Sequence, residues 1–238
     1  MVRTIKFIAI GFIFSGIISC KKDPVVVANV PPTVSLTSPA DNSRSATPGS
    51  FTITATASDA DGSISKVEFY NGATLLGTAT TSPYTFTWSG VAEGKYVITA
   101  KATDNSGAVT TSAAANVTID VTFKATLSAA NERPTPNTST ATGSSTLIFN
   151  IDTKTFTATT TYSGLTGTAT GGHIHRGDPT ISGPVIFPFS NLTVSPIVYT
   201  SAAISATDEA DFRAGNFYVN LHTALNPGGE IRGQLIKQ

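Results

Sequence analysis

Three histidines are the residues of this chain best suited to chemistry, and they are the only histidines among its 238 residues. His173 and His175 lie two positions apart in a Gly-His-Ile-His segment, and His222 ends a Phe-Tyr-Val-Asn-Leu-His segment. Side chains two positions apart on a strand point to the same face, so His173 and His175 share a face while Ile174 takes the opposite one. If the two segments form neighbouring strands, three imidazoles converge. Three histidines with one open position are a known zinc arrangement, and imidazole also suits copper.

Three polar side chains are candidates for orienting these imidazoles from outside. Asn220 shares the strand face of His222, and Glu132 and Glu230 belong to the same half of the chain. Outer hydrogen-bond partners of metal-bound histidines fix the orientation and the tautomer of the ring. The same histidines can also make ordinary hydrogen bonds in a polar patch without any metal. The sequence therefore leaves open a zinc or copper site and a hydrogen-bonded polar cluster.

Acidic residues in the first half of the chain suggest a second, different cation. Asp59 and Asp61 lie two positions apart before Gly62, and Asp104 is a third carboxylate that could join them. Ca²⁺ takes about 6–8 oxygen ligands, and this cluster offers few. Asp and Gly also build turns without any ion. A calcium site and simple turns are thus the two interpretations of these residues.

The N-terminus has the pattern of a secretory signal. Arg3 and Lys6 precede an apolar run over residues 7–18. This run is too short to span about 30 Å of hydrocarbon comfortably, so a signal peptide is favoured over a retained transmembrane helix. Ser19 is the small residue expected before a cleavage site, and the only cysteine follows at Cys20.

The segment Ile-Ile-Ser-Cys at residues 17–20 resembles the lipobox of bacterial lipoproteins. The resemblance implies a signal peptide over 1–19, lipidation of Cys20, and a membrane partner through that anchor in the bacterial cell envelope, at the outer membrane or cell surface. Several acyl chains anchor stably where one chain would not. Three prolines within residues 20–32 favour extended backbone and predict a lipid-anchored tether. A plain secretory signal followed by an unrelated cysteine is the alternative.

The amino-acid composition excludes some classes of partner and indicates the fold class. Lys and Arg number 15, as do Asp and Glu, so there is no basic surplus to neutralise phosphates and no nucleic-acid partner is expected. The single cysteine excludes a disulfide framework within the chain and any multi-cysteine metal site. Frequent Thr and Val favour strands, and 20 Gly and 13 Pro residues interrupt them. This composition predicts an all-β protein.

The first folded unit is predicted over residues 33–120. Short alternating segments recur there, at Phe51–Ala57, Lys66–Tyr70, Thr85–Trp88, Tyr96–Ala100 and Thr110–Ile119. Such spacing is typical of a β-sandwich, with Trp88 in its core. The segments Ala-Ser-Asp-Ala-Asp-Gly at 57–62 and Ala-Thr-Asp-Asn-Ser-Gly at 102–107 resemble those of bacterial Ig-like and cadherin-like domains. The resemblance implies a spacer or adhesive module.

The second unit, residues 121–238, is predicted to be another antiparallel β-sandwich or a barrel. Its strand-like segments are Thr122–Leu127, Ser145–Ile151, Thr155–Tyr162, Gly172–His175, Pro184–Phe187, Asn216–His222 and Glu230–Ile236. One helical turn is expected over Asp208–Ala214, because Thr207 can cap its start and Gly215 can close it.

This unit resembles the CHRD (chordin) domain through an ordered set of segments. They are Phe-Lys-Ala-Thr-Leu-Ser-Ala-Ala-Asn-Glu-Arg-Pro at 123–134, Tyr-Ser-Gly-Leu at 162–165, Gly-His-Ile-His at 172–175, Gly-Asn-Phe-Tyr-Val-Asn-Leu-His at 215–222 and Asn-Pro-Gly-Gly-Glu-Ile-Arg-Gly-Gln at 226–234. Each segment alone is a weak signal, but the ordered set covers nearly all of the unit. The resemblance implies an extracellular β domain and brings no enzymatic activity with it.

These observations favour a binding protein over an enzyme. No P-loop, dinucleotide-binding glycine motif or serine nucleophile elbow with triad partners stands out in the sequence. We therefore predict a lipid-anchored envelope protein in which an Ig-like stalk presents a CHRD-like domain for protein or glycan binding, without catalysis. The alternative is a zinc- or copper-binding protein, or a metalloenzyme, that uses His173, His175 and His222.

Overall fold

The computed structural model describes residues 27–192 and 194–238, which form 17 β-strands and one α-helix. Nearly all strand pairs are antiparallel, which confirms the predicted all-β class with antiparallel sheets. The predicted signal peptide (1–19) and Cys20 lie outside the described residues, as does most of the predicted tether (20–32). In the described part of the chain, no helix has the length and apolar character needed to cross a membrane.

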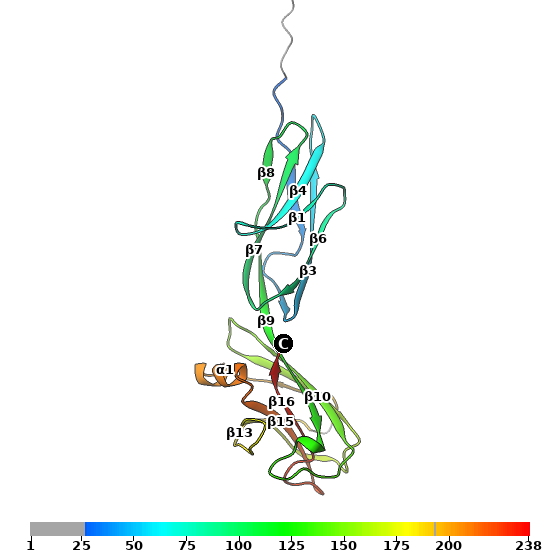
Figure 1. The fold of residues 1–238 in the computed structure, drawn as a ribbon, viewed down its shortest axis with the longest axis vertical. Helices are drawn as coiled ribbons and strands as arrows, with labels where there is room; N and C mark the ends of the chain where they lie inside the picture. Colours follow the sequence, from blue (N-terminus) through cyan, green and yellow to red (C-terminus); the bar gives the residue numbers. More distant parts are fainter. Residues whose placement is uncertain (1–26, 193) are drawn as a thin grey trace, which may run out of the picture.

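The first unit is a sandwich of two sheets (Figure 1). One sheet contains β1 (Thr33–Ser38), β3 (Gly49–Ser58) and β6 (Tyr84–Val91). The other contains β2 (Ser43–Ala46), β4 (Ile64–Asn71), β5 (Thr74–Ala79), β7 (Gly94–Asp104), β8 (Val109–Thr111) and the first half of β9 (Ala115–Ser128). The strand period explains the burial, because in β7 Ile98, Ala100 and Ala102 are fully buried while the residues between them are not.

Trp88 was expected in this core and is found at its edge. It is partly buried, packs against the core, and meets Tyr96 edge-on with ring centroids 5.0 Å apart. The fully buried positions are instead held by smaller apolar side chains such as Ile53, Val67 and Phe69.

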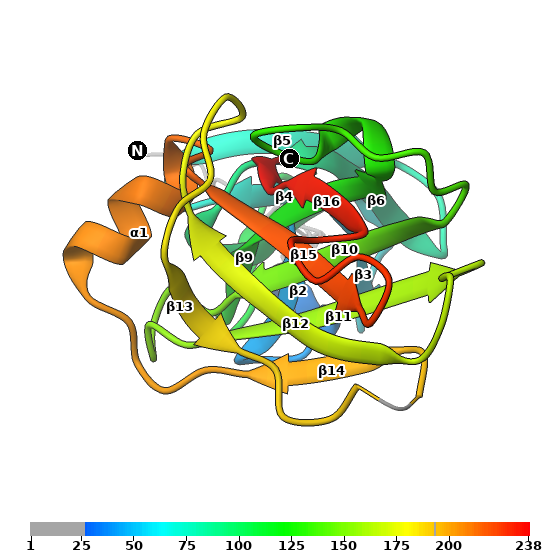
Figure 2. The same cartoon turned by 90° about the horizontal axis from the view of Figure 1, so that it is seen from below.

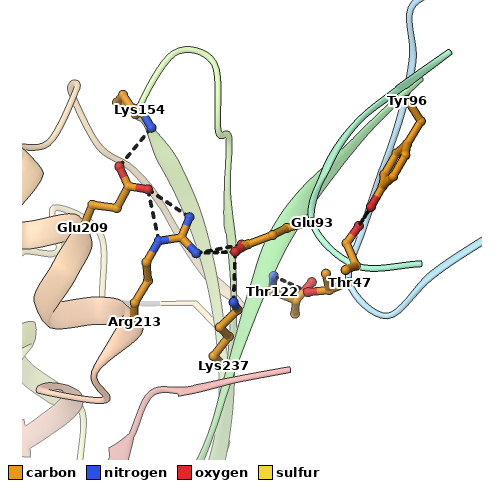
Figure 3. Close-up of polar contacts among 9 residues, drawn as sticks. Thr47, Glu93, Tyr96, Thr122, Lys154, Glu209, Arg213 and Lys237 are labelled. Carbon is orange, nitrogen blue, oxygen red and sulfur yellow. Dashed lines mark hydrogen bonds and ion pairs between the residues drawn. The ribbon is translucent and has the colours of Figure 1, made fainter. Parts of the chain in front are cut away.

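One strand belongs to both units. Residues 117–120 of β9 pair with β2, and residues 121–128 of the same strand pair with β10 (Thr142–Phe149). The predicted boundary between residues 120 and 121 therefore falls inside a continuous strand. The backbone N–H of Thr122 donates to the hydroxyl of Thr47 at 2.9 Å, which ties the second half of β9 to the first unit (Figure 3).

Glu93 lies at the centre of an ion-pair cluster across this join. Its carboxylate contacts Arg213 at 2.6 Å and Lys237 at 3.0 Å (Figure 3). Arg213 also pairs with Glu209, which in turn pairs with Lys154. Two charged residues of the second unit are thus held by one carboxylate of the first.

A second cluster across the join forms around Asp152, in the turn after β10. Its carboxylate contacts Arg44 and Lys95 of the first unit, each at 2.7 Å. Arg44 also pairs with Asp120 at 2.6 Å, on the shared strand. The two units are therefore connected at this join both by the continuous backbone of β9 and by ion pairs.

The second unit is one strongly curved sheet around an apolar interior (Figure 2). Its strand order is β13-β12-β15-β16-β9-β10-β11-β14. The bounds not yet given are β11 (Phe156–Ser163), β12 (Ala169–Arg176), β13 (Val185–Pro188), β14 (Ile197–Thr200), β15 (Phe217–Thr223), β16 (Ile231–Gln234) and β17 (Ile236–Lys237). The interior is filled by Phe123, Leu147, Phe156, Ile174 and Phe217, each at most 1 % exposed.

The helix α1 spans Ala206–Arg213, two residues earlier than predicted at its start. Its N-cap is Ser205, so the prediction of Thr207 as the cap is wrong. The Ser205 hydroxyl accepts from the backbone N–H of Asp208, and the Asp208 carboxylate accepts from the N–H of Ser205. This reciprocal pair satisfies two backbone donors, whereas a cap at Thr207 would satisfy one. Gly215 follows the helix with φ +74°, which fits the predicted closure.

Candidate functional site

The three histidines lie on two neighbouring strands of the second unit. β12 and β15 pair antiparallel, with Gly171 opposite His222, His173 opposite Asn220, and His175 opposite Tyr218. This register puts both histidines of β12 and the histidine of β15 on one face of the sheet. Ile174 points to the opposite face and is fully buried in the core. The apolar residues between the histidines thus anchor both strands.

The imidazole rings converge. The ring centroids of His173 and His175 are 5.4 Å apart, those of His173 and His222 are 5.2 Å apart, and those of His175 and His222 are 6.3 Å apart. A set of three ring nitrogens, one from each histidine, can be found in which all three atoms lie within 4.8 Å of one another. Three ring nitrogens therefore face one small region from two strands.

Backbone carbonyls fix the tautomer of two of these rings. The Nδ1 atom of His175 lies 2.9 Å from the carbonyl oxygen of Gly183, and Nδ1 of His222 lies 3.0 Å from that of Pro227. A carbonyl oxygen only accepts, so Nδ1 of each ring carries the proton and donates. The Nε2 atom of each ring is then left with a free lone pair.

One ring nitrogen of each histidine has no hydrogen-bond partner among residues 27–192 and 194–238. Nε2 of His175, Nε2 of His222 and Nδ1 of His173 are each buried and unpaired. His175 is 8 % exposed and the other two rings are half-buried. Buried polar atoms are nearly always paired in folded proteins, so three unpaired nitrogens in one cluster are exceptional.

The environment keeps these rings neutral. Burial, together with the positive charge that His222 and His175 would carry, lowers the pKa of His173 to about 4. Burial also lowers the pKa of His175, although the hydrogen bond to Gly183 acts in the opposite direction. Burial lowers the pKa of His222 as well. Near neutral pH the cluster therefore presents lone pairs.

Tyr218 and Arg232 support His175 from behind. The Tyr218 ring stacks on His175 with centroids 4.8 Å apart and planes 6° apart. The Arg232 guanidinium lies 3.5 Å from the centroid of the Tyr218 ring. Arg232 also donates to the carbonyl oxygens of Asp178 and Ile181 at 2.8 Å each. This arginine therefore fixes both the tyrosine and the loop before β13.

Gly183 joins this support to the histidine directly. Its N–H donates to the Tyr218 hydroxyl at 3.0 Å, while its carbonyl oxygen accepts from Nδ1 of His175. Gly171 serves the cluster differently, because a Cβ there would lie 3.2 Å from Cε1 of His173 and 3.5 Å from Cδ2 of His222. A glycine at this position leaves room for the two rings.

The three predicted outer partners take different positions. Asn220 lies opposite His173, and its Nδ2 donates to Glu132 at 3.3 Å while its Oδ1 is buried and unpaired. Glu132 is 2 % exposed, and burial raises its pKa to about 7. Asn220 and Glu132 thus form a pair on the histidine-bearing face.

Glu230 is held by other residues. Its carboxylate accepts from Thr223 at 2.6 Å, from Ser139 at 2.7 Å, and from both the N–H and the hydroxyl of Thr166 at 2.8 Å. Burial works to raise the pKa of Glu230, but these hydrogen bonds outweigh it and lower the pKa to about 2.

The candidate calcium residues surround the start of the first unit. Asp104 accepts from Asn29 at 2.8 Å and from the N–H groups of Ser106 and Ala108. Asp61 accepts from the N–H of Val30, and Asp59 has one oxygen that is buried and unpaired. Asp104 and Asp61 therefore tie the entering chain to two turns. The calcium site stays a prediction.

Sequence reasoning did not find Tyr218, Arg232 and Gly183 as parts of the site. The alternation of Phe217–His222 placed Tyr218 on the histidine face, and this was the available signal. No pattern in the sequence shows that Arg232 crosses to Tyr218, or that a loop returns Gly183 to His175.

Comparisons with known families agree with this architecture. Residues 32–100 match the family model of the bacterial Ig domain, and residues 123–235 match that of the CHRD domain. The chain is a bacterial Ig domain followed by a CHRD domain. The three histidines and their supporting residues all lie within the matched part of the CHRD domain. No curated protein is significantly similar to the chain.

Three solved structures show partial likeness. The fibronectin(III)-like modules of Clostridium thermocellum CbhA are 36 % identical, over 37 % of this chain and 94 % of that one, with a TM-score of 0.35. A study of carbohydrate-binding modules from the β-sandwich superfamily provides a chain with 17 % identity, coverage of 88 % and 94 %, and a TM-score of 0.32. Bacteroides ovatus SGBP-B, solved with a mixed-linkage heptasaccharide, has 12 % identity, coverage of 88 % and 70 %, and a TM-score of 0.29. All three TM-scores are below 0.5, so the likeness is partial.

Proposed function

We propose that this chain is a lipid-anchored protein of the bacterial cell envelope and acts as a non-catalytic binding module. The Ig domain is the stalk, and the CHRD domain is the part presented to an extracellular protein or glycan. The observation that carries this proposal is the shared strand β9, which removes any linker between the two domains.

The path of the chain supports the role of a stalk. The described chain enters the Ig domain beside Asp61 and Asp104, where Val30 and Asn29 are bound. The described chain enters the Ig domain at the end opposite the CHRD domain (Figure 1). An anchor attached before residue 27 would therefore hold the CHRD domain at the far end of an elongated body.

The clusters around Glu93 and Asp152 support a stiff join. They bracket the shared strand with charges contributed by both domains. Each pair is partly exposed and contributes only about 0–1 kcal/mol, so the continuous backbone of β9 is the main constraint on bending. Such a stalk fixes the orientation of the CHRD domain relative to the Ig domain.

Anchoring is tested by membrane fractionation of a bacterial host that expresses the full chain. We expect the wild type in the membrane fraction and its mature N-terminal peptide to carry the mass of a lipidated cysteine. The Cys20→Ser variant should lack this modification, and a matched Ser19→Ala variant should retain it. An unmodified Cys20 in the mature wild type would contradict the proposal.

Binding is tested with the Cys20→Ser chain in detergent, on arrays of immobilised glycans and extracellular proteins. We expect saturable binding without any chemical change of the bound molecule. Turnover of a substrate that depends on the CHRD domain would contradict the non-catalytic role.

A further inference from the structure

The histidine cluster has a feature that a hydrogen-bonded polar patch does not explain. Nδ1 of His173 and Nε2 of His175 and His222 are buried and have no hydrogen-bond partner among the described residues. One candidate donor nitrogen from each of the three rings lies within 4.8 Å of those from the other two. Leaving a buried polar atom without a partner is costly, and each ring of the cluster carries one such atom. The arrangement therefore calls for a single partner that satisfies all three nitrogens.

A water molecule satisfies all three nitrogens only when His173 carries its proton on Nδ1, because water then donates to the two Nε2 atoms and accepts from Nδ1–H. With the proton of His173 on Nε2, the cluster offers three nitrogen lone pairs. A cation accepts all three lone pairs at once.

The outer contacts match what a metal ligand requires. The carbonyl oxygens of Gly183 and Pro227 hold Nδ1–H of His175 and His222, which leaves Nε2 of both rings with a free lone pair. Such outer hydrogen bonds fix the tautomer and the orientation of metal-binding histidines. The stack of His175 on Tyr218 restricts that ring further. The donor atoms are thus held in place before any ion arrives.

We propose that His173, His175 and His222 bind one divalent transition-metal ion, zinc or copper, through Nδ1 of His173 and Nε2 of the other two rings. This inference is independent of lipid anchoring and of the extracellular partner. It makes the CHRD domain of this chain a metal-binding domain and takes the histidine-bearing sheet face as its site.

The donor set restricts the class of ion. Among the described residues, the cluster consists of three imidazole nitrogens and includes neither a carboxylate nor a thiolate. Ca²⁺ and Mg²⁺ prefer oxygen ligands, so they are poor candidates for this site. Zinc and copper bind imidazole well, and three histidines leave one coordination position for water or an external ligand.

The test measures metal retention by the full chain, purified in detergent without a histidine tag. Every sample carries Cys20→Ser, so that no thiol contributes to binding. The protein is stripped with a chelator, exposed to Zn²⁺ or Cu²⁺ in separate arms, dialysed, and analysed by elemental mass spectrometry. We expect about one ion per chain in at least one arm.

The variants assign that ion to the cluster. Substitution of outer partners of metal ligands costs about 10–100-fold in affinity, so removal of a ligand in His173→Ala, His175→Ala or His222→Ala should cost at least about 100-fold. Thr170→Ala is the matched control, because Thr170 is exposed on the same strand, β12, and we expect it to bind as the wild type does. Circular dichroism shows whether each variant is folded.

A spectroscopic measurement keeps the proposal falsifiable if the histidine variants fail to fold. In the copper arm, the electron paramagnetic resonance spectrum of the wild type should show coupling to imidazole nitrogens. A folded wild type that retains neither ion would overturn the proposal. Equal metal retention by the wild type and by a folded variant in which His173, His175 and His222 are all replaced by alanine would overturn it as well. A copper spectrum without nitrogen coupling would also overturn it.

Discussion

Tyr218 stacks on His175 in nearly parallel planes, with ring centroids 4.8 Å apart. The two residues face each other across β15 and β12, and Arg232 reaches the same tyrosine from β16 on the other side of β15. An aromatic side chain is therefore held between a cation and an imidazole that burial keeps neutral. This arrangement links the position of His175 to residues of three neighbouring strands.

Substitution of Tyr218 separates the contribution of its hydroxyl from that of its ring. Tyr218→Phe removes the acceptor of the Gly183 N–H and should lower the free energy of unfolding by about 1 kcal/mol. Tyr218→Leu also removes the stack and the cation–π contact and should cost about 2–4 kcal/mol. Urea denaturation measures both. Equal losses in the two variants would show that the faces of the ring contribute nothing.

The N-cap of α1 gives a direct comparison of the predicted and the observed residue. Ser205→Ala removes the hydroxyl that accepts from Asp208 and should lower the free energy of unfolding by about 0.5–2 kcal/mol. Thr207→Ala is the matched control, because Thr207 lies inside the helix, and it should change stability by less than about 0.5 kcal/mol. A larger loss for Thr207→Ala than for Ser205→Ala would restore the cap predicted from sequence.

The sequence predicted strands whose apolar and polar residues alternate. It did not predict features that depend on which distant parts of the chain come together in the fold. Alternation located the strands that carry His173, His175 and His222, because the strand period of two residues is visible in any segment with an apolar face. The strands β2 and β5 were not predicted, since their segments Ser43–Ala46 and Thr74–Ala79 lack a clear alternation of buried and exposed residues. β14 was not predicted either, although its four residues Ile197–Thr200 alternate. β2 and β14 are stabilised by pairing with the distant strands β9 and β11, whereas β5 forms a hairpin with β4.

The same distinction holds at the site. The face shared by Tyr218, Asn220 and His222 follows from the sequence, whereas the partner of each side chain does not. Glu230 directly precedes β16 and Arg232 lies two positions later within it, yet Glu230 binds Thr166 and Thr223 while Arg232 reaches Tyr218. Only the tertiary structure determines which of several neighbours each charged group meets.

Glu132 predicts a specific dependence of stability on pH. Burial raises the pKa of this carboxyl from its ordinary value of 4.5 to about 7 in the folded chain. Between these values the folded chain holds a proton that the unfolded chain has released. The free energy of unfolding contributed by Glu132 should therefore fall as pH rises from 4.5 to 7, by about 1–3 kcal/mol, and level off above pH 7.

The Glu132→Gln variant isolates this contribution, because glutamine is neutral at every pH. Urea denaturation at several pH values should show the variant gaining stability relative to the wild type as pH rises from 4.5 to 7. Glu93→Gln is the control: burial works to raise the pKa of Glu93, but the hydrogen bonds from Lys237 and Arg213 outweigh it and lower the pKa, so its difference from the wild type should stay nearly constant between about pH 5.5 and 7. A constant difference between Glu132→Gln and the wild type across this range would refute a raised pKa.

Changes at the join between the two domains separate the effect of the ion pairs from that of the shared strand β9. Glu93→Gln removes the pairs with Arg213 and Lys237, which are partly exposed, so the free energy of unfolding should fall by less than about 1 kcal/mol. Small-angle scattering should show nearly unchanged dimensions. Insertion of a four-residue Gly-Ser segment between Asp120 and Val121 interrupts β9 and should broaden the distribution of domain orientations, because flexible linkers behave as random coils. If Glu93→Gln alone produced the same broadening, charge pairing rather than strand continuity would be what keeps the two domains aligned.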